Sequence, residues 1–266
     1  MADDAFRLDA YLRRLGLSRQ PSPADLHRAH VTAIPFENLD PHRGVPVSLD
    51  LDALQGKLVD GGRGGYCFEH NLLLAAALRA LGAEVEPLLA RVRLGRPDGT
   101  PRPRTHLVLR VRVGGELWLA DAGFGGGTLL EPIAFEPGGV HVQSGWCFRL
   151  VRDGAEHVLE IGDADGFTQL YGFTLEPVPH VDIEVSNWFT CSHPRSPFVT
   201  GLNVVCARSD GTFVELCDWS GLSLTERTAE GSVPIPVSRE EIPAVLSARF
   251  GLPGFELGAD GRVRRA

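Results

Sequence analysis

The spacing of apolar residues changes near residue 84 of the chain. Before that point apolar positions recur at helical intervals, in "FRLDAYLRRL" (6–15) and in "PSPADLHRAHVTAI" (21–34), where Ser22 is placed to cap a helix. The segment "FEHNLLLAAALRALGA" (68–83) is apolar on almost every side and stops near Gly82, which predicts a buried helix. Residues 1–83 are therefore expected to form a helical domain.

Short segments of alternating polarity follow, separated by glycine and proline turns. They are typical of strands and predict a β-rich domain over residues 84–186. After Pro179, "VDIEVSNWFT" (181–190) reads as helix, residues 193–226 as further strands, and "SREEIPAVLSARFGL" (238–252) as a capped helix. The pattern thus predicts an α+β protein whose third domain, residues 187–266, is mixed.

Composition excludes several classes of protein. With 266 residues, 43% hydrophobic and 23% charged, the chain is expected to be globular with more than one module, and its net charge of -8 is scattered, so no nucleic-acid footprint is evident. The start "MADDAFRLDAYLRRLGL" lacks the parts of a signal peptide and no segment is apolar enough to span a bilayer, so a cytosolic protein without membrane contact is expected. Five cysteines without a CxxC pair argue against a disulfide framework or zinc ribbon and predict at least one free thiol.

One cysteine stands in a setting that suits a nucleophile. In "RGGYCFEHN" (63–71), Cys67 follows two glycines and begins a predicted helix. Glycines let the backbone turn sharply near a ligand, and the positive end of a helix lowers the pKa of a thiol. A buried, unreactive cysteine behind an ordinary glycine loop explains the same residues, and the segment alone leaves both interpretations open.

A cysteine nucleophile needs a base, and the base needs a residue to orient it. In "RTHLVLRVRVGGELWLADAGFG" (104–125), Gly114-Gly115 predicts a two-residue hairpin loop that places Val113 opposite Glu116. In that register His106 and Asp121 lie diagonally on one face, about 7–8 Å apart at the backbone, so their side chains can form a hydrogen bond.

Each member of this pair also has a structural explanation. Asp121 could cap a turn, and His106 could be an ordinary strand residue. Two such residues on one face, with Cys67 upstream, favour a Cys67-His106-Asp121 triad. His70, three residues after the cysteine, is expected to be a surface or capping residue because no acid is placed to orient it, and Glu69 is expected to support the helix start.

The three segments also resemble a known family. "RGGYCFEHN", "THLVLRV" and "DAGFG" are similar to the catalytic motifs of the arylamine N-acetyltransferases, in the same order and at suitable intervals of 39 and 15 residues. "IPFENLD" (34–40) and "NWFTCSHPRSPF" (187–198) extend the resemblance over most of the first two hundred residues. Ala122 departs from the more usual valine at its position, without consequence for the chemistry.

The resemblance implies a fold and a set of ligands. The fold would be an N-terminal helical bundle, a central β-barrel and a C-terminal α/β lid around a papain-like Cys-His-Asp core. The co-substrate would be acetyl-CoA, and the acceptor an arylamine, arylhydrazine or N-hydroxyarylamine, as in xenobiotic metabolism. The resemblance implies no metal and no permanently bound cofactor.

Candidate binding residues follow from the resemblance and from two local features. The glycines of "GFGGG" (123–127) could offer backbone amides to a coenzyme, although no Walker motif follows, and the arginine of "HPRSPF" (193–198) could meet a phosphate. The resemblance places two aromatic residues near the acceptor. The candidates are, for the coenzyme, Gly125, Gly126, Arg195, Ser196 and Phe198, and, for the acceptor, Phe36 and Phe124.

The expected reaction is a two-step exchange in which Cys67 carries the acetyl group and backbone amides, including its own, hold the oxyanion. Three alternatives stay open on the sequence alone. An amide synthase that releases or cyclises a polyketide chain would use the same triad. A Cys-His-Asp hydrolase or transglutaminase would use another acceptor, and a non-catalytic binding module would leave the thiol without a purpose. A monomer or homodimer is expected.

Overall fold

The N-terminal part of the chain is a group of helices. The computed structural model describes residues 6–18, 20–95, 100, 102–163 and 166–266. Within them, Ser22 caps the second helix by accepting a hydrogen bond from the backbone N–H of Asp25 at 3.1 Å, as predicted. In chain order the elements are α1 (Leu8–Leu15), α2 (Pro23–Ala33), α3 (Leu39–His42), α4 (Leu51–Leu54), a π-helical segment (Gln55–Asp60) and α5 (Cys67–Ala80).

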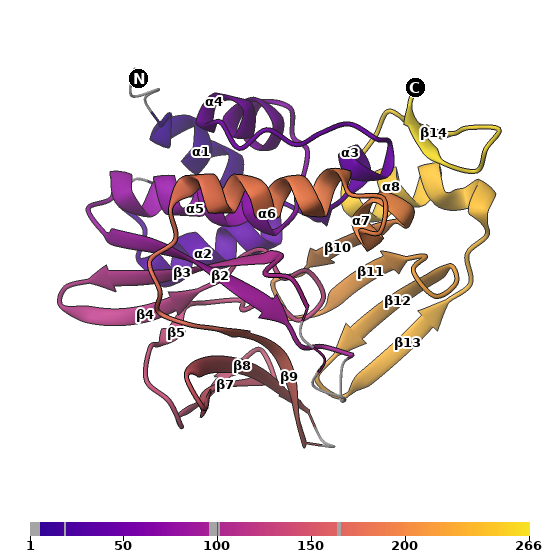
Figure 1. Cartoon of the computed structure of the whole chain (residues 1–266). Helices are drawn as coiled ribbons and strands as arrows, with labels where there is room; N and C mark the ends of the chain where they lie inside the picture. The colour runs from indigo at the N-terminus through magenta and orange to yellow at the C-terminus, as the bar shows by residue number, and fades with distance from the viewer. Residues whose placement is uncertain (1–5, 19, 96–99, 101, 164–165) are drawn as a thin grey trace.

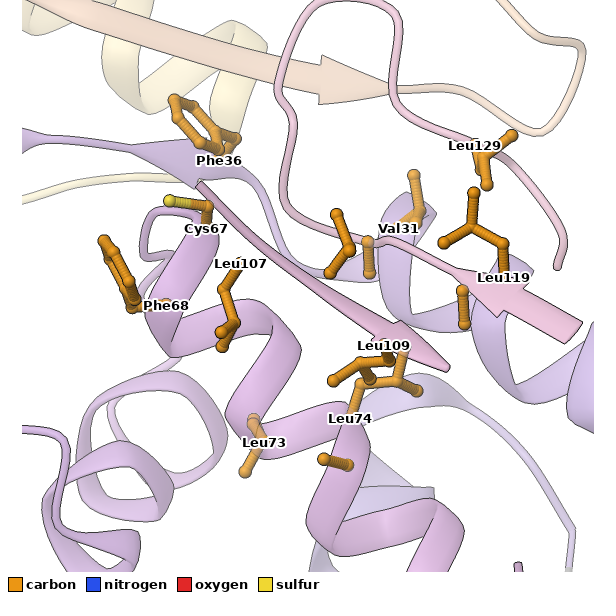
Figure 2. Close-up of a cluster of buried hydrophobic side chains, with 14 of the residues drawn as sticks. Val31, Phe36, Cys67, Phe68, Leu73, Leu74, Leu107, Leu109, Leu119 and Leu129 are labelled. Atoms are coloured by element: carbon orange, nitrogen blue, oxygen red, sulfur yellow. The ribbon is translucent and has the colours of Figure 1, made fainter. Parts of the chain in front are cut away.

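Helix α5 is the buried helix that the sequence predicts. Its leucines and alanines pack into the main hydrophobic core, and the helix contacts strands β2 (Glu84–Val92) and β3 (His106–Val113). Figure 2 shows Cys67 at the N-terminal end of α5, with Phe36, Phe68 and Leu107 around it. The cysteine therefore lies where the helices meet the sheet.

The middle of the chain forms an antiparallel sheet of eight strands in the order β5-β4-β3-β2-β9-β8-β7-β6. The sheet curves into a barrel that is not fully closed, because its edge strands β5 and β6 do not pair, and the helices cover one end of it (Figure 1). The further strands are β4 (Glu116–Ala120), β5 (Ile133–Ala134), β6 (Val140–Gln143), β7 (Trp146–Asp153), β8 (Glu156–Asp163) and β9 (Gly166–Phe173). The predicted α+β class with a central barrel is confirmed.

The C-terminal part is a five-stranded antiparallel sheet with its own core, beside the barrel (Figure 1). Its edge strand β1 (Phe36–Glu37) comes from the N-terminal region and pairs with β10 (Asn203–Ala207). The remaining strands are β11 (Phe213–Cys217), β12 (Ser223–Thr228) and β13 (Gly231–Ile235), followed by a 3-10 turn (Arg239–Glu241), α8 (Ile242–Phe250) and the hairpin β14 (Phe255–Leu257) and β15 (Val263–Arg265).

Two more helices, α6 (His180–Ser192) and α7 (Pro197–Thr200), connect the two sheets. The boundary expected between residues 186 and 187 lies within α6, because the helical segment runs unbroken to Ser192. The division into three domains stays a prediction.

The hairpin between β3 and β4 has the predicted register. Val113 pairs with Glu116, and the ladder continues without a shift to Leu109 and Ala120. The two loop glycines have φ of 60° and 87°, as a tight primed turn requires.

All five cysteines are free thiols, as expected for at least one of them. Among the described residues, no helix is both long and apolar enough to cross a membrane.

Candidate active site

The loop before Cys67 needs its glycines because it is packed too tightly for side chains. A Cβ at Gly64 would collide with the carbonyl oxygen of Pro35, and one at Gly65 would lie 2.7 Å from Oε2 of Glu69. That same oxygen accepts a hydrogen bond from the backbone N–H of Tyr66 at 3.0 Å and so caps α5. Glu69 therefore supports the helix start, as expected, and fixes Cys67 as the first helical residue.

A buried network of ion pairs holds this loop in place. Lys57 Nζ lies 2.7 Å from carboxylate oxygens of both Asp40 and Glu69, and Arg63 lies 2.5 Å from Glu37. Burial raises the pKa of Glu69 to about 7, although Lys57 opposes the shift. Nothing in the sequence indicated this network, although "IPFENLD" supplies two of its acids.

The predicted histidine and aspartate meet. His106, at the first position of β3, shares a hydrogen bond of 2.7 Å with Asp121 just after β4, and both side chains are buried. Asp121 also accepts hydrogen bonds of 2.9 Å from Asn71 Nδ2 and from the backbone N–H of Gly123. Burial alone would raise the pKa of Asp121, but the charge of His106 and these hydrogen bonds outweigh it, so the pKa lies below its usual value.

Asn71 is a supporting residue that was not among the residues predicted from the sequence. It lies one helical turn after Cys67, and its Nδ2 also donates to the carbonyl of Leu107 at 2.7 Å, while its Oδ1 accepts from the backbone N–H of Ala122 at 3.0 Å. One side chain therefore ties α5, β3 and the segment after β4 together. Its position in "CFEHN", four residues after the cysteine, was the available signal.

The thiol of Cys67 lies against the backbone next to His106. Its Sγ is 3.5 Å from the carbonyl oxygen of Thr105, a neighbour of the histidine in sequence. Burial raises the pKa of Cys67 and the negative charge of Asp121 raises it further, although backbone N–H groups, including that of Leu107, favour the thiolate. The backbone amide of Phe68 at the helix start lowers this pKa, as expected, but desolvation exceeds the effect of the backbone amides. The thiolate needs a positive partner, and His106, which lines the same cavity as Cys67, is the predicted one.

His70 is a buried residue, and the expectation of a surface or capping position is wrong. The carbonyl of Pro35 can only accept a hydrogen bond, so His70 Nε2 donates to it at 3.2 Å, and Nδ1 accepts from His30 Nε2 at 2.8 Å. His30 in turn accepts from the hydroxyl of Tyr11 at 2.5 Å. Because burial lowers the pKa of His70 to about 4 and both of its nitrogens are occupied, it is not placed to act as a base.

The thiol opens into a cavity of about 710 Å³. Most of the residues predicted for catalysis and binding line it, namely Cys67, His106, Phe36, Phe124, Gly126, Arg195, Ser196 and Phe198. Further lining residues that the sequence did not indicate include Arg102, Asn203, Glu215 and Trp219.

Two of the predicted coenzyme residues have structural contacts. Gly125 does not line the cavity. It has φ of 83°, and a Cβ there would lie 3.3 Å from the ring of Phe36, so its contact is with that ring. Ser196 is buried, donates from its hydroxyl to the carbonyl of Thr190 at 2.5 Å and caps α7 through the backbone N–H of Phe198.

The described residues contain no group of three or more histidine, cysteine, aspartate or glutamate side chains placed to hold a metal ion.

Comparison with known proteins identifies the family of this chain. A family model described as N-acetyltransferase matches residues 24–254, which is most of the chain. The arylamine N-acetyltransferase of Mycolicibacterium smegmatis is 46% identical, covering 79% of each chain, and that of Mycobacterium tuberculosis is 37% identical, covering 97% of this chain and 94% of its own. The structure of the Mycobacterium marinum arylamine N-acetyltransferase in complex with CoA superposes with a TM-score of 0.87 at 38% identity, over 92% of both chains. The chain belongs to the arylamine N-acetyltransferase family.

Proposed function

We propose that this protein transfers an acetyl group from acetyl-CoA, through a thioester on Cys67, to the nitrogen of an aromatic amine or hydrazine or to an N-hydroxyarylamine. The observation that carries the proposal is the hydrogen-bonded His106-Asp121 pair, whose histidine lines the same cavity as Cys67 in an arylamine N-acetyltransferase fold. The names of the relatives favour acetyl transfer over the amide synthase and hydrolase alternatives.

In the first half of the reaction, His106 takes the proton of Cys67 while the sulfur attacks the acetyl carbonyl. The imidazolium that results is held by Asp121 at 2.7 Å, which offsets the cost of a thiolate in a buried site. The new S–C bond forms, the bond to the CoA sulfur breaks, and CoA leaves with the proton from His106. Since one thioester replaces another, the step is nearly balanced in energy.

In the second half, an aromatic amine attacks the acetyl group on Cys67. Aromatic amines are weakly basic, so the nitrogen is unprotonated and nucleophilic at neutral pH. The C–N bond forms, the S–C bond breaks, and the amine proton passes through His106 to the sulfur. Asn71 and Gly123 act on this step indirectly, because they hold Asp121 in position.

The cavity suggests where each substrate lies. Arg195 lines it and is suited to a coenzyme phosphate, with Phe198 close by in sequence, and Gly126 offers a backbone amide. Phe36 and Phe124 line the same cavity, and the ring centroid of Phe124 lies 5.2 Å from that of His106, which suits stacking of an aromatic acceptor. A cytosolic location and a monomeric or homodimeric state remain predictions.

The test is incubation with acetyl-CoA alone, followed by intact-mass measurement and peptide mapping. Wild-type protein is expected to gain one acetyl group on Cys67 and to lose it when an arylamine is added. Cys67→Ser should fold as the wild type does and gain none. An unmodified wild-type protein, or equal turnover by the Cys67→Ser variant, would remove the thioester mechanism.

A further inference from the structure

Among the described residues that line the cavity, one has an acidic side chain that the proposed mechanism does not use. Glu215 lies on β11, where the strand register places it opposite Val205, which in turn is opposite Phe36 of β1. Residues directly opposite one another in antiparallel strands point to the same face of the sheet. Glu215 therefore points to the same side as Phe36, and both line the cavity that contains Cys67.

Its carboxyl faces the loop that follows Asp121. A Cβ at Gly126 would lie 3.0 Å from Oε2 of Glu215. The absence of a side chain at this glycine therefore leaves the carboxyl open toward the cavity. Any larger residue at position 126 would cover it.

Glu215 differs from the buried acids of this protein in having no partner. Among the described residues, the buried acids Glu37, Asp40, Glu69, Asp121 and Glu160 all have hydrogen bonds or ion pairs. Glu215 makes neither, and burial raises its pKa, against the charge of Arg227. A polar group that is largely removed from water without a partner costs free energy, which a ligand with a hydrogen-bond donor would recover.

The nearby Arg227 does not fill this role. Its guanidinium carbon lies 5.0 Å from the centre of the Trp146 ring and it does not line the cavity. It leaves the carboxyl oxygens of Glu215 without a hydrogen bond while lowering the cost of their charge.

The charged residues that line the cavity indicate different positions for the two substrates. Arg102 and Arg195 are the lining residues suited to the phosphates of a coenzyme, and they come from other parts of the chain than Glu215. A carboxylate repels phosphate. Glu215 is therefore suited to the acceptor, on the same side of the sheet as Phe36.

We propose that Glu215 determines acceptor specificity by accepting a hydrogen bond from a donor group that the aromatic amine carries away from its reacting nitrogen. This inference rests on the proposed acetyl transfer through Cys67 and names its preferred substrates. They are aromatic amines with a second N–H or O–H group, in preference to amines of the same shape that lack one. Glu215 takes no part in the transfer of the acetyl group.

The experiment compares kcat/KM for 4-aminobenzamide, which has a distal donor, with that for methyl 4-aminobenzoate, which has none. Wild type is expected to prefer the amide. Glu215→Leu should lower the amide-to-ester ratio about tenfold, the usual effect of losing a hydrogen bond to a charged group, and Glu215→Gln should lower it less. Glu256→Gln on the exposed side of β14 is the matched control and should leave the ratio unchanged.

Failure of this inference can be told apart from failure of the proposed function. If Cys67 gains no acetyl group from acetyl-CoA, the proposed function is wrong and the inference falls with it. If Cys67 is acetylated and the amines are turned over, but the ratio is the same in wild type and both Glu215 variants, only the specificity role is overturned. A loss of thermal stability in Glu215→Gln with an unchanged ratio would mean that Glu215 only stabilises the fold, through the charge of Arg227.

Discussion

The buried histidine beside Asp121 should make the fold sensitive to mild acid. His27 Nε2 accepts a hydrogen bond of 3.2 Å from the backbone N–H of Asp121, so its Nδ1 carries the proton and donates to the carbonyl of Leu130, also at 3.2 Å. Protonation of the ring would remove the acceptor that Asp121 needs. Burial lowers the pKa of His27 from 6.5 to about 4.

The size of the effect follows from that shift. Between the folded pKa of about 4 and the unfolded pKa of 6.5, the unfolded chain binds more protons, so stability falls as the pH drops through this window. At about 1.4 kcal/mol for each pH unit, His27 alone lowers the free energy of unfolding by about 2 kcal/mol at about pH 5 relative to neutral pH. The buried His70, with its pKa also near 4, should add to the total acid sensitivity.

The assay is urea unfolding followed by tryptophan fluorescence at about pH 7.5 and pH 5, for wild type, His27→Gln and His180→Gln. His27→Gln should reduce the loss of stability between the two pH values by about 2 kcal/mol. The control removes a histidine at the exposed start of α6 and should leave that loss as in the wild type. If His27→Gln loses as much stability in acid as the wild type, the buried neutral histidine is not the cause.

Three further outcomes are expected. Gly123→Ala would place a Cβ 2.7 Å from Cα of Cys67, so it should cost about 1–3 kcal/mol of stability and displace the thiol. Both Tm and kcat should therefore fall, and an unchanged kcat would contradict the close packing. Arg195→Ala should raise KM for acetyl-CoA and leave kcat largely unchanged, and an unaltered KM would exclude the phosphate role. Asn71→Ala removes three hydrogen bonds around Asp121, so the free energy of unfolding should fall by about 2–4 kcal/mol and turnover should fall too. A fully active, equally stable variant would show that Asp121 is held in position without Asn71.

The position of the His106-Asp121 pair could be predicted because it depends on local chemistry. Gly114-Gly115 fixes a two-residue loop, and the loop fixes which residues of the two strands face each other. Cys67 could be predicted for the same reason, since its glycines and its helix are adjacent to it in sequence. The ionisation of the thiol could not be predicted, because its desolvation is set by side chains from distant segments.

Other parts of the site depend on contacts that no local pattern carries. Strand β1 has only two residues and pairs with β10, more than 160 positions later, so its alternation could not be read. Glu215 looks like any polar residue of a half-buried strand until β10 and the loop at Gly126 are placed beside it. The burial of His70 likewise follows from contacts with His30 and Pro35, which are distant from it in sequence, and Tyr11 of α1 holds His30 in turn.

The rate of Cys67 alkylation by iodoacetamide as a function of pH, in wild type, His106→Ala and Asp121→Asn, tests the central claim most directly. Since proton transfer from Cys67 to His106 releases no proton to solvent, wild-type alkylation should persist near pH 6, well below the reference cysteine pKa of about 8.5. Burial then leaves the thiol of His106→Ala protonated, so its rate near pH 6 should fall at least about tenfold, with Asp121→Asn also slower than wild type. Identical curves for the three proteins would show that the His-Asp pair is structural and would contradict the proposed mechanism.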